Sequence, residues 1–110
     1  IKEQKIVNVS VIICVKDGEN SIINIISDLK NQIYKDSAEF IIVDDMSTDS
    51  TKKNILNNIG NDLRFKYISS KFGDKRLSHK KRALDAGIKI SQNDYLLFTR
   101  NKYCRYRIPR

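Results

Sequence analysis

Residues 40–51 read FIIVDDMSTDST, an apolar run that changes abruptly into two carboxylates and a series of small polar residues. A short, wholly apolar and largely β-branched run is typical of a strand that is buried on both faces of a parallel sheet. The small polar residues are good helix N-caps, and Ile55, Leu56 and Ile59 follow at helical spacing. The stretch therefore predicts a strand, a turn that carries two carboxylates, and a helix.

Two carboxylates, Asp44 and Asp45, stand at the carboxyl end of this predicted strand. In an open α/β sheet, ligands bind at the carboxyl ends of the strands. Paired Asp side chains there can accept hydrogen bonds from a base or a ribose, or hold a divalent metal ion. In a purely structural interpretation, Asp44 caps the following turn and Asp45 faces solvent. The double Asp by itself leaves both interpretations open.

Three more strands and two more helices are predicted in the rest of the chain. Strands are expected at residues 6–15, 65–69 and 95–99, and helices from about Ser21 to between Asn31 and Lys35 and from His79 to Ile90. Gly60 is a natural C-cap for the helix after residue 50, and Gly87 indicates close packing of the last helix on the sheet. The alternation predicts an α/β fold: a Rossmann-like open parallel sheet with flanking helices, right-handed crossovers and strand order 3-2-1-4.

Length and composition point to one globular domain of 110 residues. Because no apolar run reaches about 18 residues and no secretory signal opens the chain, we expect a cytoplasmic protein, free or at the inner face of a membrane. Cys14 lies inside a strand pattern and is expected in the core, and nothing supports a disulfide with Cys104. With His79 as the single histidine and no C-x-x-C pair, a zinc site is not expected.

The formal net charge of +8 is concentrated in two basic clusters. The first cluster consists of Lys75, Arg76, Lys80, Lys81 and Arg82, and the second of Arg100, Lys102, Arg105, Arg107 and Arg110. Solvated surface charge is one explanation, and the others are binding of phosphate, of nucleic acid or of an anionic membrane surface. Charge alone does not separate these alternatives.

Generic nucleotide and hydrolase motifs are absent from the sequence. No G-x-G-x-x-G follows the first strand, which argues against a dinucleotide site, and the lack of G-x-x-x-x-G-K-[ST] excludes a P-loop. Without G-x-S-x-G, a Ser-His-Asp hydrolase has little support. The remaining site candidates are acidic: Asp17 after the first strand, and Asp44 and Asp45 after the second.

Several motifs, in this order and spacing, resemble those of family 2 glycosyltransferases of the GT-A fold. They are VSVIICVKD at 9–17, LKNQIY at 29–34, IVDDMSTDST at 42–51, KKRALDAGI at 80–88 and DYLLFT at 94–99. The corresponding family patterns are V-S-V-I-I-P-x-Y-N, L-x-x-Q-x-Y, V-V-D-D-G-S-T-D-x-T, G-K-x-x-A-L-N-x-G-I and the strand that delivers a D-x-D. The match covers roughly residues 7–99, and several motifs together are far more specific than any one alone.

The resemblance implies that residues 1–99 are a GT-A nucleotide-sugar-binding half-domain, followed by a basic C-terminal tail at 100–110. It further implies transfer of a sugar from a UDP- or GDP-type donor, with UDP the first expectation, to a glycan or lipid acceptor.

The resemblance also assigns nucleotide-binding residues. They are Val15, Asp17, Asp44, Asp45, Lys80 and Lys81. Val15 and Asp17 would lie beside the base and ribose, Asp45 would contact a uracil-type base, and Asp44 would support the turn. Lys80 or Lys81 would lie near the diphosphate, which needs positive charge near a helix N-terminus.

The family expectation of Mg2+ or Mn2+ meets a departure after Thr99. The D-x-D that would hold the metal is replaced by Arg100, Asn101 and Lys102, whose cations would repel it. The acceptor half and its general base are missing as well. We therefore assign no catalytic residue and expect no turnover by this chain alone. Strand 4 should be an unprotected sheet edge, which predicts self-association.

Two alternatives from other classes stay open. A non-catalytic nucleotide-binding or regulatory module is favoured by the intact Asp45 turn together with the lost D-x-D. A basic nucleic-acid-binding domain is favoured by charge alone, because no DNA- or RNA-reading motif is recognisable.

Overall fold

Strands and helices alternate along the chain in a computed structural model that describes residues 8–31, 38–93, 95–99 and 105–109. The elements are β1 (Val9–Val15), α1 (Ser21–Asn31), β2 (Ala38–Asp44), α2 (Thr51–Ile59), β3 (Phe65–Ser69), the short 3-10 helix η1 (Ser70–Phe72), α3 (His79–Ile90), β4 (Tyr95–Thr99) and β5 (Arg105–Pro109). The predicted four strands and three helices are all present. η1 lies between the strand predicted at residues 65–69 and the helix predicted from His79, where no element was predicted.

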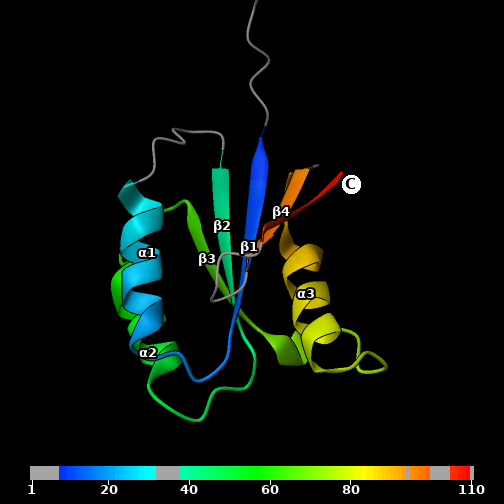
Figure 1. Cartoon of the computed structure of the whole chain (residues 1–110), viewed down its shortest axis with the longest axis horizontal. Helices are drawn as coiled ribbons and strands as arrows, with labels where there is room; N and C mark the ends of the chain where they lie inside the picture. Colours follow the sequence, from blue (N-terminus) through cyan, green and yellow to red (C-terminus); the bar gives the residue numbers. More distant parts are fainter. Residues whose placement is uncertain (1–7, 32–37, 94, 100–104, 110) are drawn as a thin grey trace, which may run out of the picture.

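One sheet of order β3-β2-β1-β4-β5 forms the centre of the described structure. β1 pairs in parallel with β2 and with β4, and β3 pairs in parallel with β2. Helices α1 and α2 cover one face and α3 covers the other (Figure 1). The chain therefore has the α/β architecture expected, with the carboxyl ends of its parallel strands at one end of the sheet. None of the helices in the described ranges is long and apolar enough to cross a membrane.

β5 overturns the expectation that β4 is an unprotected edge. Its residues Arg105–Pro109 pair antiparallel with β4, so that Arg105 lies opposite Thr99 and Pro109 opposite Tyr95. The backbone groups of a strand need partners on both sides, and β5 supplies the side that β1 leaves open. The basic segment at 100–110 thus contributes a strand, and the outer strands of the described sheet are β3 and β5.

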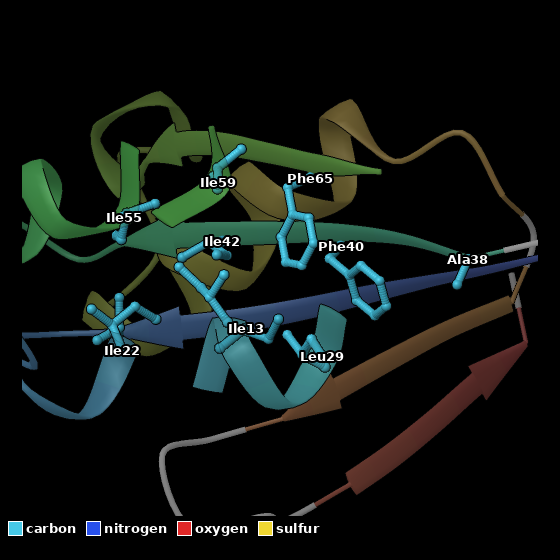
Figure 2. Packing of buried hydrophobic residues seen from close by; sticks show 11 residues of the cluster. Ile13, Ile22, Leu29, Ala38, Phe40, Ile42, Ile55, Ile59 and Phe65 are labelled. Atoms are coloured by element: carbon cyan, nitrogen blue, oxygen red, sulfur yellow. The ribbon is translucent and has the colours of Figure 1, made fainter. Parts of the chain in front are cut away.

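The core consists of two apolar clusters, one on each face of the sheet. Ile13 and Ile42 face α1 and α2, whereas Ile12 and Ile41 face α3, because successive side chains of a strand point to opposite faces. All seven residues of β2 are buried, which explains why the stretch from Phe40 to Val43 is apolar without alternation. Figure 2 shows the larger cluster, made of Ile13, Val15, Ile22, Ile26, Leu29, Ala38, Phe40, Ile42, Ile55, Ile59 and Phe65.

Small residues bring α3 close to the sheet. Ala83, Ala86 and Gly87 are its buried residues. A Cβ atom added at Gly87 would lie 2.7 Å from Ile12 Cγ2 and 3.1 Å from Val43 Cγ2, closer than van der Waals contact allows. The close packing that Gly87 predicted is confirmed. Cys14 packs partly buried against this same cluster.

A buried carboxylate, Glu39, joins three segments near the amino ends of the strands. Glu39 Oε1 accepts hydrogen bonds from Ser10 Oγ at 2.6 Å and from the Gln92 N–H at 2.7 Å, and Lys66 Nζ lies 2.9 Å from its Oε2. Burial disfavours the charged carboxylate, but the hydrogen bonds from Ser10 and Gln92 and the Lys66 ammonium outweigh it and lower the pKa of Glu39. The ionised form of Glu39 is therefore the form that the fold stabilises.

This arrangement predicts an acid-sensitive contribution to stability. Because the folded-state pKa of Glu39 is lowered, its contribution is complete above the ordinary value of 4.5 and is lost as the pH falls through the folded-state value. In Glu39→Gln the amide keeps one acceptor but lacks the charge. The difference in free energy of unfolding between wild type and Glu39→Gln should shrink as the pH falls below about 4.5. Urea titrations at several pH values measure it, and a difference independent of pH would contradict the assignment.

Candidate nucleotide-binding site

The turn after β2 is built around Asp44, the last residue of that strand. Its side chain is buried, Oδ1 accepts the Ser47 N–H at 3.1 Å, and Oδ2 accepts the Tyr67 hydroxyl at 3.2 Å. Burial, followed by the charge and hydrogen bond of Asp44, raises the pKa of Tyr67 to about 12. Asp44 is thus used within the protein, where it ties the turn to β3.

The backbone of Asp45 is fixed by a hydrogen bond, whereas its side chain forms none with the described residues. Its N–H donates to the Val15 carbonyl at 2.8 Å, which continues the β1–β2 pairing beyond the strands. Within the described ranges no residue forms a hydrogen bond or ion pair with its half-buried carboxylate. Met46 follows with φ 56°, a left-handed conformation, at a position that the family pattern V-V-D-D-G-S fills with glycine. The turn therefore offers a carboxylate that is available to a ligand.

The loop after β1 lies against this turn. Asp17, also left-handed with φ 48°, accepts the Thr48 N–H at 2.7 Å and the Thr48 hydroxyl at 3.3 Å through Oδ1. The Asp17 N–H donates to Ser47 Oγ at 2.9 Å. The structure thus brings Val15, Asp17 and Asp45 together, but it engages one oxygen of Asp17 within the protein.

Lys80 and Lys81 occupy the first turn of α3. Both are exposed, and neither forms an ion pair with a carboxylate in the part of the chain that the structure describes. Because α3 returns antiparallel to the strands, its N-terminus lies at the end of the sheet where the Asp45 turn is found (Figure 1). The unsatisfied N–H groups of a helix N-terminus favour an anion there, and the two lysines add charge.

Asp49 and Tyr67 also shape the site, through contacts that the sequence did not single out. The small polar residues that the sequence offers as N-caps of α2 are Ser47, Thr48, Asp49 and Ser50. Among them, Asp49 binds the first turn, because its Oδ1 accepts the Thr51 N–H at 2.9 Å and also the Thr51 hydroxyl. Ser50 makes no side-chain cap bond. The hydrogen bond from Thr51 lowers the pKa of Asp49. Tyr67 carried no signal beyond its place in a strand. The β2–β3 register sets it opposite Ile42, and its long side chain reaches diagonally to Asp44.

The metal ligands expected for the family are the carboxylates of a D-x-D, which this sequence lacks after Thr99. Among residues 8–31, 38–93, 95–99 and 105–109, no group of three His, Cys, Asp or Glu side chains could hold a metal ion. The position of the lost D-x-D, at residues 100–102, lies outside the described residues. We therefore assign no metal ligand.

Comparison with known proteins establishes the family. The model of glycosyl transferase family 2 matches residues 10–99, so the chain belongs to that family. A search of curated protein sequences finds no match.

Solved glycosyltransferases share the fold. A mannosyltransferase from Pyrobaculum calidifontis, solved with GDP-Man and Mn2+, superposes with a TM-score of 0.73 at 21% identity. S. aureus TarS, residues 1–349, gives 0.64 at 27% identity, and glucosyl-3-phosphoglycerate synthase from Mycobacterium tuberculosis, solved with Mg2+ and UDP, gives 0.63 at 20%.

The matched region is a minor part of these enzymes. In each comparison it covers 86% of this chain, but 27% of the mannosyltransferase, 27% of the TarS chain and 33% of the synthase. The likeness therefore concerns most of this chain and about a quarter to a third of each of these enzymes.

Proposed function

We propose that this chain is the donor-binding part of a nucleotide-sugar-dependent glycosyltransferase, which takes a UDP- or GDP-type donor and serves a glycan or lipid acceptor. The observation that carries the proposal is the Asp45 carboxylate. Its backbone is anchored to Val15 by a 2.8 Å hydrogen bond, and its side chain has no partner among the described residues.

The chemistry of the surrounding groups suits a nucleoside diphosphate. A carboxylate accepts hydrogen bonds from the ring N–H of uracil or guanine, and charge-assisted bonds of this kind are about twice as strong as neutral ones. The diphosphate would lie toward the N-terminus of α3, where Lys80 and Lys81 supply positive charge. In this arrangement Asp45 selects the base and the helix binds the phosphates.

The solved neighbours support a nucleotide-sugar donor, but they do not distinguish a uracil from a guanine nucleotide. The mannosyltransferase was solved with GDP-Man, and TarS with UDP-GlcNAc. The acceptor and the general base that deprotonates it belong, in this proposal, to the part of such enzymes that the match does not cover. The function proposed for residues 1–99 is donor binding.

Calorimetric titration of UDP, GDP and their sugars, with and without Mn2+, tests the proposal. We expect one nucleotide series to bind and Asp45→Ala to weaken it by about 10- to 100-fold, the value of a charged hydrogen bond. Mn2+ should add little, because no metal ligands are assigned. Asp28→Ala, which removes an exposed carboxylate from α1, is the matched control and should bind like wild type. Failure of every nucleotide to bind, or equal binding by Asp45→Ala, would contradict the proposal.

A further inference from the structure

Two loops at the carboxyl edge of the sheet are joined by reciprocal hydrogen bonds, and the bonds involve residues about 30 positions apart. The loop between β1 and α1 contributes Asp17 and Glu19, and the loop between β2 and α2 contributes residues 47–50. We propose that Asp17 and Glu19 are positioning residues, which hold the Asp45 turn in its binding conformation without contacting the nucleotide. This inference rests on the proposed function.

Asp17 makes the first half of the connection. Its N–H donates to Ser47 Oγ at 2.9 Å, and its Oδ1 accepts from the Thr48 N–H at 2.7 Å and the Thr48 hydroxyl at 3.3 Å. Each loop therefore donates to the other, so that neither can move alone without breaking a hydrogen bond.

Glu19 repeats the arrangement two residues later. Its Oε2 accepts the Ser50 N–H at 3.0 Å, and its own N–H donates to Asp49 Oδ2 at 3.3 Å. The Glu19 carbonyl accepts Asn54 Nδ2 at 2.7 Å, which extends the connection into α2. Backbone groups that would otherwise be unsatisfied at the start of α2 are thus paired with the loop after β1.

The conformation of the enclosed turn explains why such a connection is needed. Asp45 and Met46 lie between the Val15 carbonyl, which binds the Asp45 N–H, and the bonds at Ser47 and Thr48. Met46 has φ 56° and Asp17 has φ 48°, so each loop contains a left-handed residue that is not glycine. Strained residues of this kind persist only where the surrounding structure holds them. The bonds on both sides of Met46 do so, and they determine where the Asp45 carboxylate lies.

This positioning role differs from the one that the family resemblance implies for Asp17, which is to lie beside the base and ribose of the nucleotide. A direct contact would use the charge of the carboxylate, whereas the loop connection uses Oδ1 as an acceptor. Asp17→Asn keeps an oxygen acceptor and tolerates the left-handed conformation; Asp17→Gly tolerates the conformation and removes the acceptor. The two variants therefore distinguish a residue that positions the turn from one whose carboxylate contacts the nucleotide.

Amide hydrogen exchange of Thr48 and Asp45, measured by NMR on the nucleotide-free chain, is the first readout, and nucleotide affinity by calorimetry is the second. In Asp17→Gly, Thr48 and Asp45 should exchange about 10-fold faster, and the Kd should rise about 10-fold. Asp17→Asn should stay within about 3-fold of wild type in both measurements. Glu19→Gln should likewise keep the exchange of Ser50 close to the wild-type rate.

Two results would overturn the inference. Unchanged exchange of Thr48 in Asp17→Gly would show that the connection does not hold the turn. A Kd weakened equally in Asp17→Asn and Asp17→Gly, with Thr48 still protected in Asp17→Asn, would show that the carboxylate contacts the nucleotide. If the wild-type chain binds no nucleotide, the proposed function fails, and the exchange of Thr48 and Asp45 alone decides whether Asp17 positions the turn.

Discussion

Replacing Gly73 with alanine should lower the free energy of unfolding by about 3 kcal/mol or more, near the upper end of the usual cost of overpacking. A Cβ atom at this buried position would lie 2.0 Å from the Arg82 carbonyl oxygen and 2.8 Å from Arg82 Cγ. The oxygen belongs to the backbone of α3, so relief requires the segment between η1 and α3 to move. The N-terminus of α3, with Lys80 and Lys81, would be displaced in consequence.

Thermal and urea unfolding of the variant measure this effect, and a loss of about 3 kcal/mol corresponds to a fall in Tm of about 10 °C or more for a chain of this size. Gly60→Ala is the control. A Cβ atom added at Gly60 meets nothing within 4 Å, so this variant tests only the cost of placing a side chain at a φ of 56°. It should cost about 1 kcal/mol, from backbone conformation alone. A Gly73→Ala variant as stable as wild type, or less damaging than Gly60→Ala, would show that the segment before α3 does not pack as described.

Replacing Asp44 with alanine should cost about 2–4 kcal/mol, since it leaves the Ser47 N–H and the Tyr67 hydroxyl without their acceptor. Asp44→Asn keeps an oxygen acceptor for one of them and should cost less. The asparagine variant also removes the negative charge that helps to raise the pKa of Tyr67 to about 12. In Asp44→Asn we therefore expect Tyr67 to ionise at lower pH, nearer its ordinary value of 10.0.

Urea unfolding measures the first effect, and ultraviolet titration of the tyrosines, with Tyr67→Phe to assign the signal, measures the second. Because the folded-state pKa of Tyr67 is raised, the stability it contributes is complete below pH 10.0 and is lost as the pH rises toward about 12. In Asp44→Asn, the stability that Tyr67 contributes should be lost at a lower pH than in wild type. An unchanged titration of Tyr67 in Asp44→Asn would mean that the two side chains are not in contact.

Local patterns predicted most of the elements correctly because each pattern reports one physical property. The apolar run of β2 reflects burial on both faces, and the spacing of apolar residues placed α3 at His79–Ile90, the range that the structure has. Alternation of strands and helices then led to a parallel sheet, since connections of that length are helical crossovers. Gly87 indicated from the sequence that α3 packs closely on the sheet, as the structure shows.

β5 shows where such patterns fail. Residues 105–109 contain two arginines, a tyrosine and a proline, which is not the composition of a central strand. They form a strand because β4 offers an unpaired edge at the right distance along the chain. That cause is non-local, and no window of sequence around residue 105 contains it.

The sequence by itself determined the α/β sheet, the family and the acidic turn at Asp44 and Asp45, because periodicity, capping and motif spacing are properties of neighbouring residues. Only the tertiary structure decided what each carboxylate does. Strand register places Tyr67 opposite Ile42, from where its hydroxyl reaches Asp44 two residues further along β2. Adjacent strand ends bring Thr48 to Asp17 across 31 positions. The carboxylate of Asp45, in the same turn, has no partner within the described residues. Identical side chains thus acquire different roles because hydrogen-bond partners are set by contacts between distant segments.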